Sequence, residues 1–165
     1  MSFESLKIGS TVEVGGIEWI VLDKNHDTAL CLTRNFIDTC HFDAKTANFA
    51  KSELYKKLHG EFFEKVKYAV DDIYLDLTSD DGLDDYGEIH CKVGLLTCDM
   101  YRRYNRIIEK YPVNNWWWLS TAFSTPHRGY SSYVRVVRGS GSLCYGNCNY
   151  DYGVRPFCIF KSNIF

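Results

Sequence analysis

The sequence contains few prolines and no long apolar run. Only three prolines occur among the 165 residues, and no stretch approaches the roughly 20 consecutive apolar residues of a membrane-spanning helix. Residues 1–14 show no apolar run behind a basic start, so we expect no secretion signal and no membrane partner, and we predict a cytoplasmic protein. Hydrophobic residues at 45% and charged residues at 24% exclude a disordered tail, a collagen-like repeat and a coiled coil.

The cysteines lack the spacing of a metal site or a disulfide framework. There are seven, an odd number, and without a secretion signal this indicates free thiols that behave as small buried hydrophobic groups. Six residues separate Cys91 from Cys98, and three separate Cys144 from Cys148, unlike the tight cysteine pairs of a structural zinc site. We therefore predict no disulfide and no metal ion.

Known catalytic motifs are also missing. The chain contains no G-x-S-x-G, and none of the glycine loops that bind phosphate, G-x-x-x-x-G-K-[ST] or G-x-G-x-x-G. We therefore assign no catalytic residue and no cofactor. An enzyme with a Cys/His or Cys/Cys site, of oxidase type, stays an alternative, because a histidine distant in sequence can lie beside a cysteine in the fold.

Charge is unevenly divided along the chain. Residues 1–100 carry a net charge of −9 and residues 101–165 a net charge of +7, which predicts one acidic and one basic face. Residues 71–88 hold eight acidic residues and no basic one. A calcium-binding loop of the EF-hand type needs glycine at its sixth position and oxygen ligands at earlier positions. Placing Gly82 or Gly87 at the sixth position leaves at least one of these ligands missing, so a solvated loop is expected. This segment is the competing contact site, suited to a basic partner or to mimicry of a phosphate backbone.

Basic residues in the last third raise the alternative of single-stranded nucleic-acid binding. A stripe of basic residues is predicted along one helix, and further arginines alternate with tyrosines beyond it; they are Arg102, Arg106, Lys110, Arg128, Arg135 and Arg138. An ordinary solvated helix face is the preferred interpretation of the stripe, because the N-terminal part of the chain is acidic and the overall pI near 6.2 argues against nucleic acid.

The hydrophobic pattern predicts an α+β fold with an antiparallel sheet. Helices are expected at residues 53–59 and 100–110, with one or two helical turns at 61–66. Asp99 is expected to cap the second helix, and Arg155 to be buried and hydrogen-bonded to backbone carbonyls or a carboxylate. Strands are expected at residues 12–14, 17–22, 29–33, 73–77, 92–97, 116–120, 133–138, 142–145 and 154–160.

Aromatic residues are abundant, with 12 tyrosines, 10 phenylalanines and 4 tryptophans. In a strand, Trp116 and Trp118 point to one face and Trp117 to the other, so at least one face is core. Residues 143–152 are rich in Tyr, Asn and Gly, the composition of recognition loops, although a loop packed by its own tyrosines would look the same. We predict a binding surface formed by this loop and the residues at its base: Arg128, Tyr130, Arg138, Tyr145, Asn147, Asn149, Tyr150 and Tyr152.

Four ordered blocks resemble a known family. Trp117-Trp118-Leu119-Ser120, a glycine-punctuated polar stretch and then Gly153-Val154-Arg155-Pro156 resemble the "WWLRSP … GVRP" signature of a bacterial and phage domain of unknown function. Residues 16–23, 52–62 and 92–97 resemble its opening hairpin, a helix and a strand. Ser120 stands where the family has arginine, Tyr55 replaces the helix arginine, and lectin-type calcium motifs are absent.

The resemblance implies a fold and a function. The family is related to C-type lectin-like domains, including the formylglycine-generating-enzyme clade and the variable proteins of diversity-generating retroelements. It implies one C-type lectin-like domain over residues 1–165, with antiparallel sheets, two helices, a long irregular C-terminal loop region and neighbouring N- and C-terminal strands. The function it favours is a noncatalytic binding module that recognises a protein partner. Such a module could be a phage- or mobile-element-encoded inhibitor of a host protein, for example of a defence nuclease.

Overall fold

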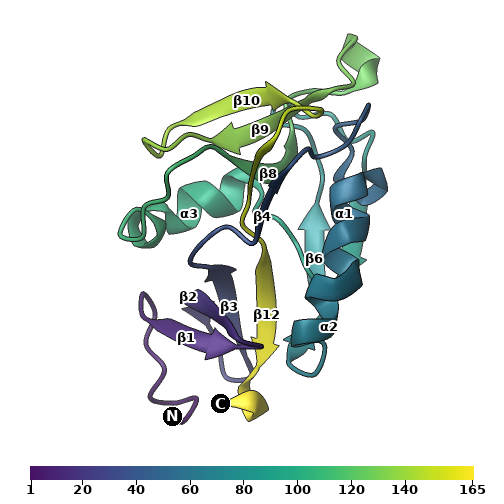
Figure 1. The fold of residues 1–165 in the computed structure, drawn as a ribbon. Coiled ribbons are helices and arrows are strands. Elements are labelled where there is room, and N and C mark those ends of the chain that lie inside the picture. The colour runs from purple at the N-terminus through teal and green to yellow at the C-terminus, as the bar shows by residue number, and fades with distance from the viewer.

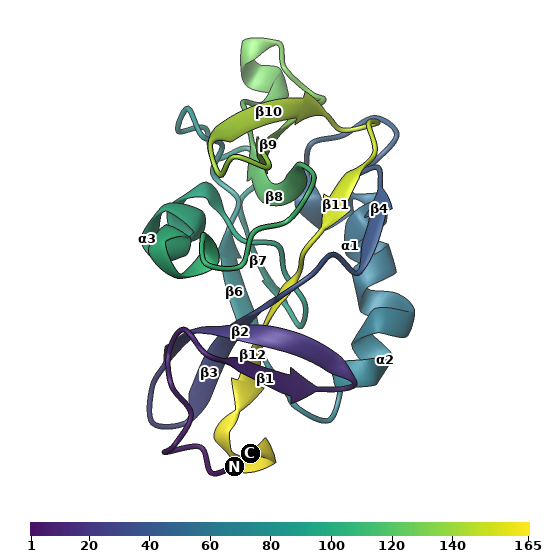
Figure 2. The same ribbon diagram turned by 60° about the vertical axis from the view of Figure 1, so that its left-hand side comes forward.

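The computed structural model describes all residues, 1–165, and contains two five-stranded sheets. The first sheet is antiparallel throughout and joins the two ends of the chain. Its order is β1 (Thr11–Val14), β2 (Ile17–Lys24), β3 (Thr28–Thr33), β12 (Phe157–Lys161) and β5 (Val70–Asp71). The last strand lies between β3 and β5, so the N- and C-terminal strands are neighbours, as predicted (Figures 1 and 2).

The second sheet lies at the other end of the molecule (Figure 1). Its order is β10 (Leu143–Asn147), β9 (Tyr133–Val137), β8 (Trp117–Ala122), β11 (Tyr152–Val154) and β4 (Asp38–Cys40). All pairs are antiparallel except β11 with β8, which meet at the pair Gly153 and Trp117. A separate hairpin consists of β6 (Ile73–Asp76) and β7 (Glu88–Cys91).

One interrupted helix and one regular helix lie on opposite sides of the molecule (Figure 1). The interrupted helix consists of α1 (Glu53–Lys57), a π-helical turn (Leu58–Phe62) and α2 (Phe63–Val66), and Gly60 leaves helical geometry at φ −96° and ψ −123°. The regular helix is α3 (Cys98–Ile108). Short 3₁₀ turns occupy Phe49–Lys51, Pro126–Arg128 and Ser162–Ile164. The fold is therefore α+β, as the pattern predicted.

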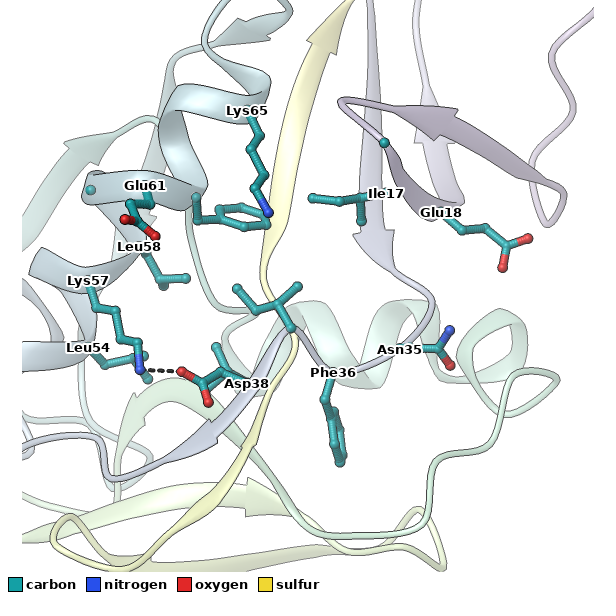
Figure 3. A pocket seen from close by; sticks show the side chains of 15 residues that line it. Ile17, Glu18, Asn35, Phe36, Asp38, Leu54, Lys57, Leu58, Glu61 and Lys65 are labelled. Carbon is teal, nitrogen blue, oxygen red and sulfur yellow. Dashed lines mark ion pairs between the residues drawn. The ribbon is translucent and has the colours of Figure 1, made fainter.

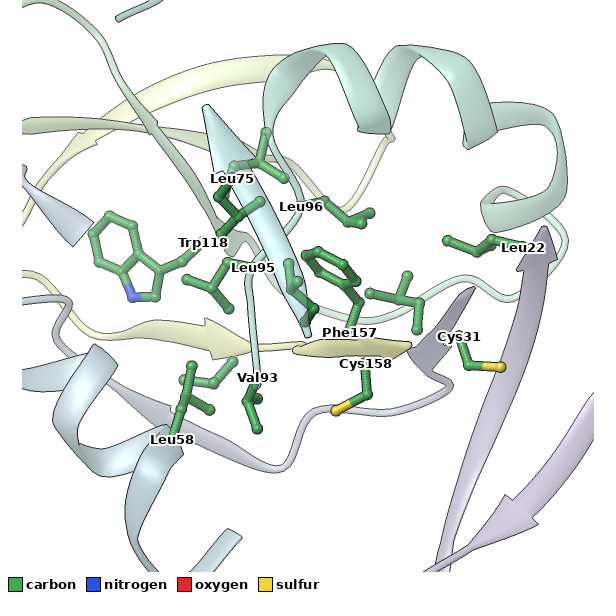
Figure 4. Close-up of a cluster of buried hydrophobic side chains, with 14 of the residues drawn as sticks. Leu22, Cys31, Leu58, Leu75, Val93, Leu95, Leu96, Trp118, Phe157 and Cys158 are labelled. Atoms are coloured by element: carbon green, nitrogen blue, oxygen red, sulfur yellow. The ribbon is translucent and has the colours of Figure 1, made fainter. Parts of the chain in front are cut away.

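A continuous hydrophobic core connects the two sheets and the helices. Figure 4 shows Phe157 of β12 beside Leu95 and Leu96, whereas Cys158 extends from the other side of the strand, near Val93. Cys31 and Cys158 lie opposite each other in the ladder between β3 and β12, and both are fully buried free thiols. None of the helices is both long and apolar enough to span a bilayer.

Arg155 lies at the junction between the two sheets, in the short link from β11 to β12. Its Nε donates to the Thr33 carbonyl at 2.9 Å, and one terminal nitrogen donates to the carbonyls of Arg34 at 2.8 Å and Tyr111 at 3.1 Å. The guanidinium carbon lies 5.1 Å from the centre of the Trp117 ring. The prediction of a buried arginine bonded to backbone carbonyls is confirmed.

The structure corrects several predicted boundaries. Residues 92–97 form no strand. Residues 93–96 are buried, but their backbone meets the sheets only where Gly94 bridges Phe157 and where the Leu96 carbonyl accepts from the Ser120 N–H at 2.9 Å. The predicted strand 154–160 is two strands, interrupted at Arg155 and Pro156, because proline has no N–H to donate to a ladder. The hydroxyl of Thr97, rather than Asp99, caps α3 by accepting from the Met100 N–H at 3.1 Å.

Candidate binding surface

The surface is built on the hairpin of β9 and β10. Along β9, Val134 and Val136 are buried while Tyr133 and Arg135 are only partly covered, the alternation expected of a strand with one face in the core. The register sets Tyr145 of β10 opposite Arg135, so Tyr145 shares the outward face of Tyr133. The turn closes where the Gly141 N–H donates to the Arg138 carbonyl at 2.9 Å, with Gly141 at φ +90°.

Four aromatic rings gather on this outward face, and we call them the aromatic face: Phe123, Tyr130, Tyr133 and Tyr145. The ring centroids of Phe123 and Tyr145 are 5.0 Å apart, those of Tyr133 and Tyr145 5.4 Å, and those of Phe123 and Tyr130 5.4 Å. Tyr130 remains 40% exposed and Tyr145 48% exposed. The rings therefore support one another and still present large aromatic area to solvent.

A second aromatic group lies on the opposite face of the hairpin, and we call it the Trp116 cluster: Trp116, Trp118, Tyr150 and Tyr152. Tyr152 stacks on Trp116 at 5.5 Å, meets Trp118 edge-on at 4.8 Å and contacts Tyr150 at 6.2 Å. Trp117 points the other way, toward Tyr101, which confirms the predicted alternation of the three tryptophans. A Cβ on Gly146 would lie 2.5 Å from the Tyr152 ring, so Tyr152 packs directly beneath β10.

Arg138 joins this second group. Its guanidinium carbon lies 5.1 Å from the centre of the Trp116 ring, and one terminal nitrogen donates to Cys144 Sγ at 3.1 Å. No carboxylate lies within ion-pair distance of Arg138, so its charge is available to a partner.

The residues predicted for binding do not form one continuous loop. Tyr145 and Asn147 belong to strand β10, which matches the strand predicted at 142–145 but extends to Asn147, so the expected loop begins later in the chain. Asn149 and Tyr150 lie in the turn that follows, where the Asn147 side chain accepts from the Asn149 N–H and the Asn147 carbonyl from the Tyr150 N–H. Tyr130 and Tyr145 lie on the aromatic face, whereas Arg138, Tyr150 and Tyr152 lie with the Trp116 cluster.

Arg128 is held by the acidic segment. Its terminal nitrogen donates to the Asp81 carboxylate at 2.9 Å, and the Ser124 hydroxyl donates to the same carboxylate at 2.6 Å. Asp80 pairs with Arg135 at 3.2 Å and with Arg102 at 3.3 Å. The expectation of a simply solvated acidic loop therefore holds for Asp84 and Asp85, which are exposed, but not for Asp80 and Asp81.

The largest cavity lies elsewhere, and sequence reasoning missed it. It has a volume of about 640 Å³ and opens between the interrupted helix and the hairpin of β1 and β2 (Figure 3). Phe36, Leu58 and other apolar side chains line it, Lys65 extends over it, and Lys57 forms an ion pair with Asp38 at one side. A volume of this order suits a small ligand. No motif in the sequence indicates a cavity at this place.

Burial governs the chemistry of most cysteines. Cys31, Cys91, Cys98, Cys148 and Cys158 are buried, and burial raises the pKa of Cys31 and Cys91 to about 12 and that of Cys148 to about 11. Thiols with such pKa values are almost entirely protonated at neutral pH and are poor nucleophiles. The candidates left for an enzyme are the partly exposed Cys40, whose pKa burial also raises, and Cys144.

The comparisons with known proteins add no relative. The chain matches no family model, no curated protein and no solved structure. The resemblance stated from the sequence motifs stays a prediction, and the function has to be argued from the surface itself.

Proposed function

We propose that this protein is a noncatalytic binding module that recognises a protein partner through the aromatic face. The observation that carries the proposal is the group of four mutually packed rings on a sheet surface, two of them tyrosines that are 40% and 48% exposed. Tyrosine anchors protein interfaces because it offers a large, rigid contact area and a polar tip.

The scaffold beneath the rings supports this role. Val134 and Val136 fix β9 in the core, and the Asp80–Arg135 ion pair holds the same strand from its outward side. Rings whose positions are set before binding lose little conformational entropy when a partner arrives. The aromatic face is therefore suited to binding without rearrangement.

The finer description of the fold and role rests on the sequence resemblance. We propose a C-type lectin-like domain, since the last strand lies between strands from the first half of the chain, and an inhibitor of a host protein as the biological role. A defence nuclease is the kind of target that the resemblance favours. A cytoplasmic location is part of the same proposal.

Partner capture with matched variants tests the binding role. Wild type, Tyr130→Ala/Tyr145→Ala and Tyr74→Ala are immobilised and exposed to a lysate of the source cells, and retained proteins are quantified by mass spectrometry. Tyr74 is an exposed tyrosine of β6, so its variant controls for nonspecific aromatic contact. We expect a partner that wild type and Tyr74→Ala retain equally and the double variant loses, with each alanine substitution weakening affinity by about 2 kcal/mol.

Salt dependence separates the aromatic face from the acidic segment. Binding through the aromatic face should change little with ionic strength, whereas acidic mimicry should weaken steeply. Asp84→Asn/Asp85→Asn is the matched variant because these two carboxylates are exposed and make no ion pair. A partner lost only with that variant would show that the acidic segment, not the aromatic face, makes the contact.

A further inference from the structure

Strand β10 is an edge strand with a free row of backbone groups. It pairs with β9 alone and lies at the outer end of the sheet (Figure 1). At the two ends of the ladder, the Arg138 N–H donates to the Ser142 carbonyl and the Cys148 N–H donates to the Ser132 carbonyl. Bonding in an antiparallel ladder alternates from residue to residue. The backbone N–H and C=O groups of the even-numbered residues of β10 therefore point toward β9, and those of the odd-numbered residues point away from the sheet.

The outward groups form a template for another strand. They are the N–H and C=O of Leu143 and of Tyr145, and the N–H of Asn147, whose carbonyl already accepts from the Tyr150 N–H. Donors and acceptors that alternate at this spacing match an extended peptide backbone. Most natural edge strands are covered or blocked by charge or proline, and β10 has neither within Leu143–Asn147.

Side chains on both faces of β10 define what an added strand would carry. Tyr145 and the aromatic face lie on one side, so a residue pointing there would be apolar or aromatic. The neighbouring residue of the added strand would point to the opposite face, where it would meet Cys144, Trp116 and Arg138 near the start of β10. Because Arg138 has no ion-pair partner, a carboxylate at that position would be stabilised.

We propose that β10 binds an extended segment of the partner by strand addition, with an apolar side chain against Tyr145 and a neighbouring acidic side chain against Arg138. This inference rests on the proposed function and names its mode. A second copy of this chain fits less well, because Leu143–Asn147 contains no acidic residue that could meet Arg138 if two copies of β10 paired.

A displayed peptide library supplies the probe. Random peptides of about ten residues, longer than a typical strand, are selected against the immobilised protein, and the enriched sequences are synthesised for affinity measurement. We expect apolar residues at alternate positions and an Asp or Glu at a neighbouring position, and we expect Arg138→Gln to weaken binding only of peptides that carry the acid. Tyr74→Ala is the control and should bind as wild type does.

Backbone methylation tests the pairing without altering the protein. Each amide of a selected peptide is N-methylated in turn, which removes one donor. We expect a loss of about tenfold or more at alternate amides, those facing β10, and less than about twofold at the amides between them. In the protein, Tyr145→Pro removes one outward N–H together with the tyrosine ring and leaves the β9 ladder intact, so its affinity and thermal unfolding are compared with those of Tyr145→Ala, which loses the ring alone.

The possible outcomes distinguish a failure of strand addition from a failure of the proposed protein-binding function. Methylation losses that do not alternate, or a library that yields no peptide above background, would refute strand addition. If Tyr145→Ala still abolishes partner capture in that case, the proposed function stands without its mode. Self-association that Tyr145→Pro abolishes would identify a second copy as the occupant, and Tyr145-dependent binding of labelled oligothymidine would identify nucleic acid; either result overturns the proposal.

Discussion

Arg155 shows how a single side chain joins the two sheets. It is fully buried, and burial lowers its pKa to about 10, so it remains charged at neutral pH. No carboxylate balances the charge; three carbonyls and the Trp117 ring surround it instead. The carbonyl of Tyr111 comes from the segment after α3, and those of Thr33 and Arg34 from the end of β3, so one guanidinium holds distant parts of the chain together.

Truncation of Arg155 should destabilise the protein strongly. Arg155→Ala leaves three buried carbonyls without a donor and creates a cavity, and we expect a loss of about 3 kcal/mol in the free energy of unfolding. Urea denaturation measures it, with Arg106→Ala, an exposed arginine that makes no ion pair, as the control. An unfolding free energy equal to that of wild type would show that Arg155 is not structural.

Among the helices, the interrupted one depends on His59. Its Nδ1 lies 2.8 Å from the Tyr55 carbonyl, and its Nε2 accepts from the backbone N–H groups of Lys92 and Val93 at 3.2 and 3.3 Å. A carbonyl can only accept and an N–H can only donate, so these three bonds require the neutral ring with its proton on Nδ1. His59 thus attaches the π-helical turn to the buried segment after β7.

Removal of that ring should loosen the helix. His59→Ala leaves the N–H donors of Lys92 and Val93 without a partner, whereas the Tyr55 carbonyl still accepts from the Leu58 N–H, and we expect a loss of about 2 kcal/mol in unfolding free energy. His26→Ala, in an exposed turn, should cost less than about 0.5 kcal/mol. Chemical denaturation of both variants provides the comparison, and equal losses would show that the bonds of His59 do not matter.

Elements with a clear period in their apolar residues were predictable. The strand 73–77 and the helix 100–110 showed such periods: Ile73 and Leu75 are buried on one face of β6, and Tyr101 and Ile108 are buried on one face of α3. The run 92–97 is apolar because it is buried, yet it makes almost no ladder bonds, and an apolar run cannot distinguish the two cases. Gly94 is needed there because a Cβ would lie 2.7 Å from the Phe157 ring.

The composition of the sequence predicted which region of the chain carries the candidate surface, but it did not predict how the residues of that surface are arranged. The Tyr, Asn and Gly content of residues 143–152 pointed to the correct region of the chain, but the strand predicted at 142–145 was too short, because the residues after Tyr145 lack the aliphatic side chains that would indicate a strand up to Asn147. An edge strand with Tyr145 outward and Gly146 over the Tyr152 ring does not need the usual apolar alternation. Phe123, Tyr133 and Trp116 were missed because their contacts join residues far apart in sequence.

Across the whole molecule, the acidic and basic parts of the chain meet instead of forming separate faces. Asp80 and Asp81 bind Arg102, Arg128 and Arg135 from the C-terminal third. For Asp81, burial raises the pKa, but the hydroxyls of Ser124 and Ser79 and the Arg128 guanidinium outweigh it and lower the pKa overall.

Asp43 provides a sharper test of acid sensitivity. Burial raises its pKa, but the N–H groups of Lys45, Thr46 and Glu53, each at 2.9 Å, and the nearby His41 lower it below the ordinary 3.8. The folded pKa is therefore depressed, so its contribution to stability is present above about pH 4 and is lost as the pH falls further. Asp43→Asn should cost about 2 kcal/mol at pH 7.

The pH dependence of stability distinguishes the loss of the Asp43 charge from a purely steric effect of the Asp43→Asn substitution. The difference in unfolding free energy between wild type and Asp43→Asn should shrink below pH 3.8, because wild type then loses the charged form too. Thermal unfolding measured from neutral to acid pH gives this difference. The control Asp84→Asn, which alters an exposed carboxylate, should have the same stability as wild type at each pH. Parallel profiles for wild type and Asp43→Asn would contradict the assignment.

The two chain ends lie together at the pole opposite β10 (Figures 1 and 2), and the rings of Phe3 and Phe165 are 5.8 Å apart between centroids. A short peptide can therefore join them, and new ends can be opened in the turn at Ser140 to give a circular permutant. The same closeness allows the domain to be inserted into a surface loop of a carrier protein with little distortion of either. In such a graft the carrier would sit behind the first sheet, and the tyrosines would point away from it into solution.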